Sequence, residues 1–351
     1  MRVLITGGAG FVGHSLAKNF RQNNHDVVCF DNLMRRGSEL NIIPMQELGI
    51  HFIHGDIRCP EDLQNIPGEF DLFIEASAEP SVHAGTQGSA VGLINTNLFG
   101  AMNCWEFAIK RCDFSIFLSS SRVYSIDSLR ALPLSEEETR LKIGAVSEGI
   151  MDGGIDESFS TQGFRSFYGA TKLCAENLLQ EYARQYNHKC VINRCGVLCG
   201  EGQWGKTDQG VFTLWVARHH FKKSLKYTGF GGKGKQVRDL MHPRDLFNLI
   251  QKQYDLREKL RGDIYNVGGG LEISTSLLEY SQLCEKITKN KLDIPSDLST
   301  AAVDIPYYVG SNLKAMKDFS WKPQIGTEEI VQKIHSWIIK EEKILKSFFG
   351  K

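Results

Sequence analysis

The chain has 351 residues, of which 42% are hydrophobic and 23% charged, a composition typical of globular proteins. Its 41 basic and 41 acidic residues cancel, so charge indicates no nucleic-acid or anionic-membrane partner, and we expect neither. No apolar run reaches the ~18 residues of a membrane span, and the chain opens directly on an apolar strand rather than on a secretory or transit segment, so we expect a cytoplasmic protein.

The first half of the chain alternates short apolar runs with helical patterns. This alternation is typical of βαβ units and predicts an α/β fold with a doubly wound parallel sheet. The predicted strands are 2–6, 26–31, 50–56, 70–77, 114–121 and 189–198, and the predicted helices are 14–23, 90–111 and 168–187.

The pattern changes after residue 200, where Gly-rich turns separate predicted helices at 209–222, 274–288 and 327–348. We therefore predict a dinucleotide-binding domain over 1–200 and a smaller, mixed α/β domain over 201–351. The second domain is expected to bind mainly substrate and to interleave with the first. Residues 125–165 form a long insertion rich in Glu, Ser and Gly, which is expected to be functional or ordered by its own short elements.

The nine cysteines are scattered without the spacing of a disulfide framework. Cys29 and Cys190 lie in apolar, strand-like runs, which favours reduced, buried thiols in a cytosolic protein. Cys195 and Cys199 are four residues apart, but no His or Cys pair lies nearby to complete a zinc site. We therefore expect no metal.

The segment TGGAGFVG (6–13) contains G-x-G-x-x-G at Gly8, Gly10 and Gly13, and equally G-x-x-G-x-x-G from Gly7. Missing side chains permit a tight strand-to-helix turn and let backbone N–H groups approach a pyrophosphate at the helix N-terminus. A strand precedes the motif and a helix follows it, and Asp31 ends the second strand 18 residues after Gly13. This context predicts a dinucleotide site rather than a generic turn.

The acid that ends the second strand also bears on the choice of dinucleotide. Asp31 would accept hydrogen bonds from the adenosine ribose and repel a 2′-phosphate, which favours NAD over NADP. Arg35 and Arg36 follow closely and weaken that preference. Asp56, after the third strand, stands where the adenine edge would be read, with a plain turn residue as the alternative.

A serine-ended strand and a Tyr–Lys pair supply candidate chemistry. FLSSSRVY (117–124) closes the fifth strand, at the sheet edge where doubly wound folds bind ligands. Tyr168 and Lys172, in FYGATK (167–172), lie one helical turn apart on one face. A nearby ammonium group favours the phenolate, so such a pair can accept a proton from a hydroxyl. Read alone, Y-x-x-x-K is a weak motif, because an ordinary surface helix can carry a Tyr and a Lys at this spacing. The catalytic interpretation is favoured by the order of the motifs along the chain: the Gly-rich turn, the acid, the serine-ended strand and then this pair.

That order resembles the extended short-chain dehydrogenase/reductase superfamily, the NAD-dependent nucleotide-sugar epimerases and dehydratases, over nearly the whole chain. The resemblance implies a Rossmann-type fold, bound NAD, a nucleotide-sugar substrate, and a homodimer or homotetramer with the Tyr168 helix in one interface. It implies Tyr168 as the base, Lys172 as its helper and Ser120 as the catalytic hydroxyl. RCGV (194–197), GKGKQVRDLMHPRDL (232–246) and WKP (321–323) match further family stretches.

The resemblance also implies two sets of binding residues. Those for the cofactor are Gly7, Gly10, Phe11, Val12, Gly13, Asp31, Asn32, Arg36, Asp56, Ile57, Ala76, Ser77, Ala78, Tyr168, Lys172 and Cys195. Those for the substrate are Glu79, Ser120, Arg122, Arg194, Gln209, Gly210, Gln236 and Arg238, with Arg238 on the nucleotide diphosphate.

Several stretches indicate which enzymes of this superfamily the chain resembles most. Dehydratases of this superfamily carry an Asp-Glu pair directly after the catalytic hydroxyl, where this chain has Ser121 and Arg122, so dehydration is disfavoured. The segment between VY and FYG is longer than in galactose 4-epimerases. DNLMRRG (31–37), AEPSV (78–82), KTDQGVFTLWVARHHF (206–221) and GKQVRD (234–239) resemble the CDP-paratose 2-epimerases, or tyvelose epimerases.

The resemblance then implies redox-neutral C2 epimerisation of a CDP-linked deoxysugar through a transient keto-sugar, with retained NAD. A 4-epimerase, a net nucleotide-sugar reductase or dehydrogenase, and a dinucleotide sensor without turnover are the alternatives. The family's diphosphate-binding Arg before WKP is replaced by Pro306, and its Asn after the sixth strand by Val197.

Other polar residues could have either a functional or a purely structural role. Lys206, Lys233 and Lys235 could replace the missing Arg or be solvated loop lysines. His219 and His220 lie in an apolar helix, where packing is a better interpretation than a metal or acid/base role.

Overall fold

The computed structural model describes residues 1–86, 88–144, 148–151, 153–204 and 210–349. In this part of the chain a seven-stranded sheet has the order β14-β10-β5-β4-β1-β2-β3, and all of its strand pairs are parallel. Its strands are β1 (Arg2–Thr6), β2 (Asp26–Asp31), β3 (His51–His54), β4 (Phe70–Glu75), β5 (Cys112–Ser120), β10 (Lys189–Cys195) and β14 (Arg261–Val267). The strand order reverses between β1 and β4, which confirms the doubly wound, Rossmann-type sheet.

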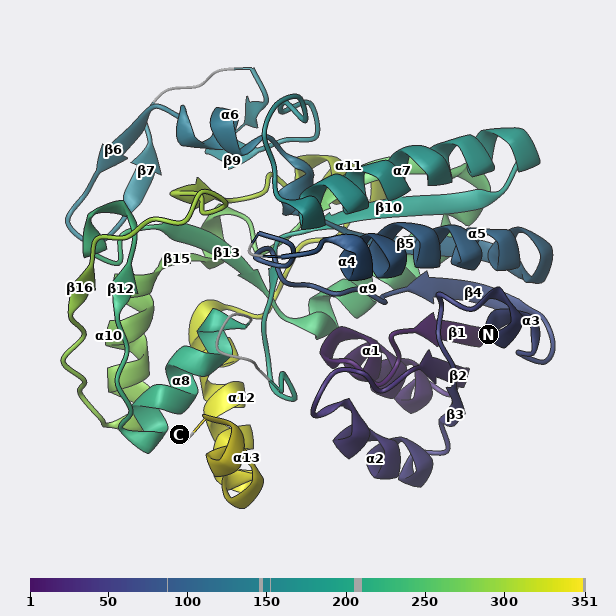
Figure 1. Ribbon diagram of the computed structural model, residues 1–351, viewed down its shortest axis with the longest axis horizontal. Helices are drawn as coiled ribbons and strands as arrows, with labels where there is room; N and C mark the ends of the chain where they lie inside the picture. Colours follow the sequence, from purple (N-terminus) through teal and green to yellow (C-terminus); the bar gives the residue numbers. More distant parts are fainter. Residues whose placement is uncertain (87, 145–147, 152, 205–209, 350–351) are drawn as a thin grey trace.

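Helices cover both faces of this sheet (Figure 1) because neighbouring side chains of each buried strand point in opposite directions. Val3 and Ile5 of β1 pack into one apolar cluster, and Leu4 between them packs into the other. The first cluster includes side chains of α1 (Phe11–Gln22), α2 (Ile42–Glu47), α9 (Pro243–Asp255) and α11 (Leu313–Phe319). The second includes side chains of α3 (Pro60–Gln64), α5 (Gly100–Arg111) and α7 (Phe167–Tyr186).

The predicted helix at 90–111 is confirmed, with a local irregularity. It consists of α4 (Val91–Ile94), a π-helical segment η2 (Asn95–Phe99) and α5 in direct succession. Asn97 within η2 is buried; its side-chain Nδ2 donates to the Glu79 carbonyl and its Oδ1 accepts from the Glu79 N–H. The wider helical turn thus holds the loop after β4, in line with the frequent occurrence of π segments at functional sites.

The C-terminal half builds a second sheet around β13 (Val237–Met241), at the left of Figure 1. β13 pairs parallel with β11 (Val197–Leu198) and β17 (Tyr307–Tyr308), and antiparallel with β15 (Ser274–Ser276). A third apolar cluster lies among α8 (Val211–Phe221), α10 (Leu277–Thr288), α12 (Thr327–Lys340) and α13 (Glu342–Phe349). Strands β12 (Tyr227–Thr228) and β16 (Ser296–Asp297) form a separate parallel pair. β14 crosses back from this half to complete the main sheet.

The single strand predicted over 189–198 is wrong in one respect, because it divides into β10 of the main sheet and β11 of the second. Gly196 separates them, and a Cβ there would lie 2.7 Å from the Asp239 carboxylate. The close approach of β13 therefore turns the chain away from the main sheet.

Residues 125–165 contain short elements of their own, as expected. These are α6 (Ile126–Arg130), β6 (Leu134–Glu136), β7 (Leu141–Ile143), β8 (Ile150–Met151) and β9 (Gly154–Ile155). Arg140 ties the insertion to the start of α10 through Glu279, with Nη2 2.6 Å from Oε2. The Ile155 N–H donates to the Val309 carbonyl at 2.7 Å. The remaining short helices are η1 (Ser38–Asn41), η3 (Ser121–Val123), η4 (Phe230–Gly232), η5 (Arg257–Lys259) and η6 (Leu271–Ile273).

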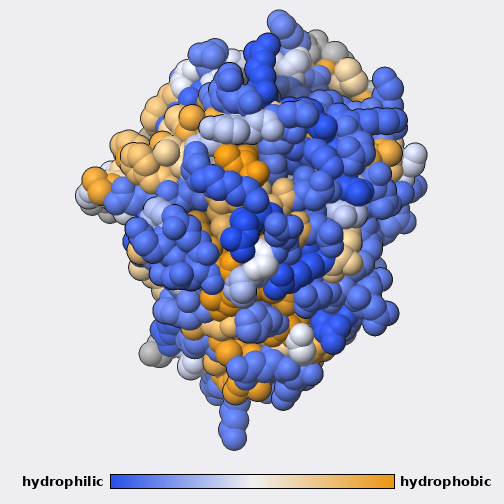
Figure 2. Space-filling model, turned by 90° about the vertical axis from the view of Figure 1, so that its right-hand side faces the viewer, coloured by the Kyte–Doolittle hydropathy of each residue, from blue (hydrophilic) through white to orange (hydrophobic). Residues whose placement is uncertain are grey.

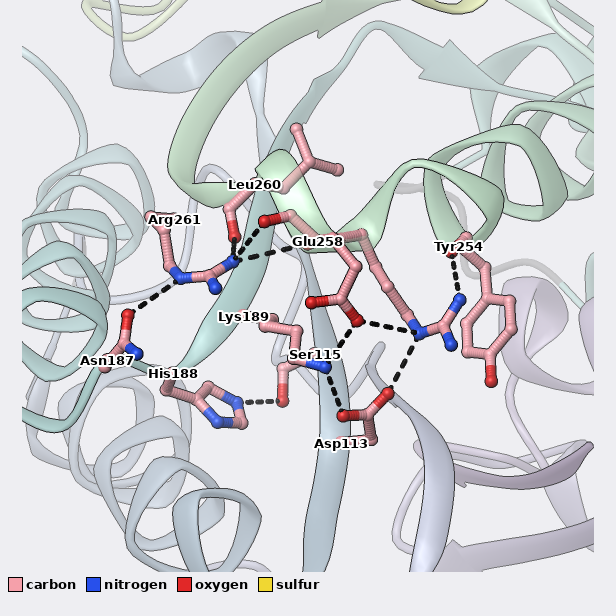
Figure 3. Close-up of polar contacts among 10 residues, drawn as sticks. Asp113, Ser115, Asn187, His188, Lys189, Tyr254, Glu258, Leu260 and Arg261 are labelled. Carbon is pink, nitrogen blue, oxygen red and sulfur yellow. Dashed lines mark hydrogen bonds and ion pairs between the residues drawn. The ribbon is translucent and has the colours of Figure 1, made fainter.

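A polar network closes the end of the sheet where the strands begin (Figure 3). Lys189 Nζ lies 2.6 Å from Asp113 and 2.7 Å from Glu258, and Arg257 Nε donates to the same aspartate. Figure 2 shows this face to be mainly hydrophilic, with hydrophobic residues along a central band and in a patch at the upper left of the view. No helix within the described ranges is long and apolar enough to cross a bilayer. Doubly wound sheets bind ligands at the opposite end, where the strands finish.

Candidate active site

The Gly-rich turn after β1 depends on the absence of side chains. Gly7 has φ of 66°, and a Cβ on it would lie 2.7 Å from the Ala76 carbonyl oxygen after β4. A Cβ on Gly13 would lie 2.1 Å from the Gly7 carbonyl oxygen. Helix α1 therefore starts tightly against the ends of β1 and β4, with its N-terminus at the point where the strand order reverses.

A cavity of about 470 Å³ opens beside this turn, within the usual size range of ligand pockets. Its walls include eight of the predicted cofactor residues: Gly7, Gly10, Asp31, Asn32, Ile57, Ala76, Ser77 and Ala78. The glycine cradle and the acid at the end of β2 fit the adenosine half of a dinucleotide. Phe11, Val12 and Gly13 lie in the first turn of α1 and are not among the lining residues.

One aspartate, Asp31, lines the cavity, and a second, Asp56, lies between two lining residues, Gly55 and Ile57. Asp31 accepts from the N–H groups of Ala9 (3.1 Å) and Leu33 (2.8 Å), and burial raises the pKa of its carboxyl. Asp56 lies 2.5 Å from Arg58, and the hydrogen bonds from this guanidinium lower the pKa of Asp56 to about 2. Sequence reasoning missed Arg58, a lining residue, although its place two residues after Asp56 was the available signal.

Ser120 and Tyr168 are brought together by a glycine. Ser120 ends β5, and its Oγ accepts from the Arg122 N–H at 3.2 Å, which caps η3. Ser166 caps α7 by accepting from the Gly169 N–H. A Cβ on Gly169 would lie 2.1 Å from the Arg122 carbonyl oxygen, so the first turn of α7 packs directly on the backbone that follows Ser120. This contact places Tyr168 at the end of β5.

Lys172 lies one turn further along α7, with only 2% of its surface exposed. Its Nζ donates to the Leu118 carbonyl on β5 at 3.0 Å and lies 3.7 Å from Glu75 Oε2 at the end of β4. Burial raises the pKa of the Glu75 carboxyl, and Lys172 opposes that shift. Sequence reasoning missed Glu75; its signal was a charged residue ending the apolar run DLFIE (71–75). Glu75 thus helps to hold the candidate helper lysine.

Arg194, a predicted substrate residue, is buried in a network below the site. Its Nη2 lies 2.7 Å from Glu176 Oε2, and its Nη1 donates to the Tyr124 hydroxyl at 3.2 Å. Ser119 donates to the same glutamate. Because its guanidinium is engaged inside the protein, this arrangement favours a supporting role for Arg194. Cys195, beside it, is also buried.

Two other predicted substrate arginines converge from different elements. Arg122 Nη1 donates to the Val303 carbonyl at 3.2 Å, and Arg238 Nη2 donates to the Ile305 carbonyl at 2.7 Å. Burial, and next the charge of Arg122, lowers the pKa of Arg238 to about 9. Arg122 is also in the electrostatic field of Tyr168. A basic region therefore extends from the candidate base to β13.

The remaining predicted binding residues occupy varied places. Glu79 lines the cavity. Gln236 Nε2 donates to the Thr228 carbonyl, while its buried Oε1 has no partner among the described residues. Gly210 precedes α8 with φ of 72°, whereas Gln209 lies outside the described residues. The Arg36 guanidinium lies 4.6 Å from the centre of the Phe348 ring.

Two of the three lysines considered as replacements for the missing family Arg have other partners. Lys233 and Lys235 both contact Glu136 Oε1, at 2.8 and 2.9 Å. Lys206 lies outside the described residues. His219 Nδ1 lies 3.0 Å from the Asn290 carbonyl oxygen in a buried position, in line with the packing interpretation.

Comparisons with known proteins agree with this geometry. The model of the NAD dependent epimerase/dehydratase family matches residues 3–268. The chain is 29% identical over 346 residues to CDP-paratose 2-epimerase of Salmonella typhi, covering 96% of this chain and 99% of that protein. It is 26% identical over 349 residues to a putative UDP-glucose 4-epimerase of Methanocaldococcus jannaschii, with 96% and 98% covered. Among solved structures, a UDP-glucuronic acid 4-epimerase from Bacillus cereus in complex with UDP-glucuronic acid and NAD has a TM-score of 0.77 and 23% identity, covering 97% of this chain and 99% of that chain.

Proposed function

The chain belongs to the NAD-dependent epimerase/dehydratase family, and we propose that it epimerises C2 of a CDP-linked deoxysugar while keeping its NAD. The coarser assignment, an enzyme of the NAD-dependent nucleotide-sugar epimerase/dehydratase superfamily, follows from the family match and the relatives. The similarity to a CDP-paratose 2-epimerase supports the finer one.

One observation carries the choice of epimerisation. The Gly169–Arg122 contact seats Tyr168 beside the end of β5, and the two positions after Ser120 hold Ser121 and Arg122. An acid and a base for removing water from a sugar are absent from those two positions. The site is therefore equipped to move a proton on and off a hydroxyl and lacks, at that place, the groups for elimination.

In this mechanism each residue has a distinct task. NAD, when bound, supplies reversible hydride acceptance. The Tyr168 phenolate accepts the proton of the C2 hydroxyl and later returns it, while the Lys172 ammonium favours the phenolate. The Ser120 hydroxyl donates a hydrogen bond to the sugar oxygen that becomes a carbonyl. Binding of the diphosphate holds the substrate in the site while the keto-sugar rotates to present its other face to the cofactor. The binding energy for this comes from a part of the substrate that does not react.

We include two further expectations in this proposal. Val91, Phe99 and Phe167 expose apolar side chains on α4, η2 and the start of α7, which supports a homodimer or homotetramer using these helices. All nine cysteines are free and six of them are buried, which supports a cytoplasmic location.

The direct test is product analysis by NMR after incubation with CDP-, UDP-, dTDP- and GDP-sugars, without added cofactor. We expect inversion at C2 of a CDP-sugar and release of stoichiometric NAD when the protein is denatured. Tyr168→Phe should abolish turnover, and Tyr186→Phe, an exposed residue at the far end of the same helix, should not. Inversion at C4 would instead support the second candidate, a 4-epimerase, which the M. jannaschii relative favours. A requirement for added NAD(P)H that is consumed would overturn the epimerase assignment.

A further inference from the structure

Two guanidinium groups from distant parts of the chain meet on one short segment. Arg122 donates to the Val303 carbonyl at 3.2 Å, and Arg238 donates to the Ile305 carbonyl at 2.7 Å. Those carbonyls flank a single residue, Asp304. The two cations are close enough that each lies in the other's electrostatic field.

The charge of this pair is incompletely balanced. Neither Arg122 nor Arg238 has a carboxylate of the described residues within 4.0 Å; Asp304 acts on both, and Asp239 on Arg238, only at longer range. By contrast, Arg140 and Arg194 each contact a glutamate directly, at 2.6 and 2.7 Å. Two partly buried cations without a contacting anion are costly, unless a ligand supplies the anion.

The position of the pair relates it to the reacting group. Arg122 lies two residues after Ser120, its carbonyl oxygen touches Gly169, and its side chain is in the field of Tyr168. An anion held by this guanidinium is therefore near the candidate base. Arg238 lies on β13, the strand that centres the second sheet, so the pair spans the two halves of the molecule.

We propose that Arg122 completes a clamp on the diphosphate of the nucleotide sugar by holding the phosphate that is joined to the sugar. The other member of the clamp, Arg238, is the residue that the family resemblance already assigns to the diphosphate. This inference rests on the proposed function and deepens it. Arg122 thereby replaces the arginine that the family carries where this chain has Pro306. A planar guanidinium matches phosphate oxygens by forming two parallel hydrogen bonds.

The clamp also bears on which carbon reacts. In a nucleotide sugar the phosphate is attached through one oxygen to C1, which is bonded to C2, whereas C4 lies across the ring. A phosphate-binding arginine beside the base therefore fits reaction at C2 better than at C4. Arg122 occupies one of the two positions after Ser120 at which water-eliminating relatives place acids, so phosphate binding and elimination compete for the same place.

Calorimetric titration of the NAD-saturated protein with CDP and with CMP tests the clamp without turnover. Arg122→Met should weaken CDP binding about 10- to 100-fold, the loss expected for a charge-assisted hydrogen bond. It should leave CMP binding nearly unchanged, because CMP lacks the second phosphate. Arg122→Lys should fall between, since it keeps the charge and loses the planar fork. Arg238→Met should also weaken CDP binding.

Arg130→Met is the matched control. Arg130 is exposed and donates to the carbonyls of Ala301 and Asp304, on the same segment but outside the clamp. It should change CDP affinity less than about 3-fold, as expected for an exposed contact. Loss of affinity in this control equal to that in Arg122→Met would show that the segment, not the clamp, matters and would overturn the inference.

The remaining outcomes separate the clamp from the proposed function. If folded Arg122→Met binds CDP like the wild type, the clamp is wrong; a loss confined to turnover would then place Arg122 on the sugar. If the Arg122→Met difference between CDP and CMP appears while no sugar is epimerised, the clamp stands and the proposed activity fails. The same difference measured with UDP and UMP would support the clamp with another base.

Discussion

Asp239, next to Arg238, provides a quantitative test of how the site is built. It has no exposed surface, and its Oδ2 accepts from the N–H groups of Gly310 (3.3 Å) and Gly270 (3.4 Å). Its Oδ1 has no partner among the described residues. Burial raises the pKa of Asp239 from 3.8 to about 7, although the two backbone N–H groups oppose the shift.

The raised pKa predicts a specific pH dependence of stability. A folded state that holds the proton more tightly than the unfolded state gains stability below pH 3.8, and this gain is lost as pH rises through about 7. Integrated from about pH 5 to about pH 8, the loss attributable to Asp239 is about 2–3 kcal/mol. Asp239→Asn keeps the size and shape of the side chain but removes its ionisable group. Any loss of stability caused by the amide itself should therefore be the same at every pH.

Urea unfolding followed by circular dichroism at both pH values provides the measurement. Burial lowers the pKa values of His14 and His188 from 6.5 to about 4, so these residues add stability as pH rises between those two values. Their contribution opposes that of Asp239 in the pH dependence of wild-type stability. The readout is therefore the unfolding free energy of the wild type minus that of Asp239→Asn, which should fall by about 2–3 kcal/mol from pH 5 to pH 8. Asp293→Asn, at an exposed position, should show a flat difference. A flat difference for Asp239→Asn as well would refute the reasoning.

Three further predictions concern the cofactor turn, the helper lysine and the supporting network. Gly13→Ala should abolish NAD retention because its Cβ would meet a carbonyl oxygen at 2.1 Å, whereas Gly326→Ala, at a position that has open space around it and does not line the cavity, should retain NAD in the purified protein. Glu75→Gln removes the negative charge 3.7 Å from Lys172. Because a negative charge near the site disfavours a second anion there, its removal should make the catalytic base easier to deprotonate and move the acid limb of the kcat/KM profile to lower pH. An unmoved limb would show that Glu75 serves packing alone. Arg194→Met should cost about 3–5 kcal/mol in chemical unfolding because its glutamate partner is left buried and unpaired; a loss below ~1 kcal/mol would contradict the network's importance.

Six of the seven strands of the main sheet could be predicted, because most of them are apolar runs with buried side chains on both faces. β14 (RGDIYNV) was not among the predicted strands, because charged and polar residues interrupt its apolar pattern. β1 and β2 were predicted with the bounds that they have in the structure. The strands of the second sheet were not, because they are short and depend on distant partners. β15 consists of Ser274, Thr275 and Ser276, and only its pairing with β13 makes it a strand.

The candidate site was predictable where a motif is local and not where it is assembled by packing. Tyr168 and Lys172 share a helical turn, so their spacing indicated a common face. Glu75 faces Lys172 of α7 from the end of β4, almost 100 residues earlier in the chain, and no local pattern connects them. Arg122 and Arg238 meet only because the segment around Asp304 binds both guanidiniums, which no spacing in the sequence discloses.

The most direct test of the central claim is to follow a label at the reacting carbon. A CDP-linked deoxysugar carrying deuterium at C2 should give the C2 epimer with the deuterium kept at C2 in ordinary water, because the hydrogen leaves and returns as hydride within the closed site. Loss of the label to solvent would show that the hydrogen leaves as a proton, and the account of Tyr168, Lys172 and bound NAD as a hydride-transfer site would be contradicted.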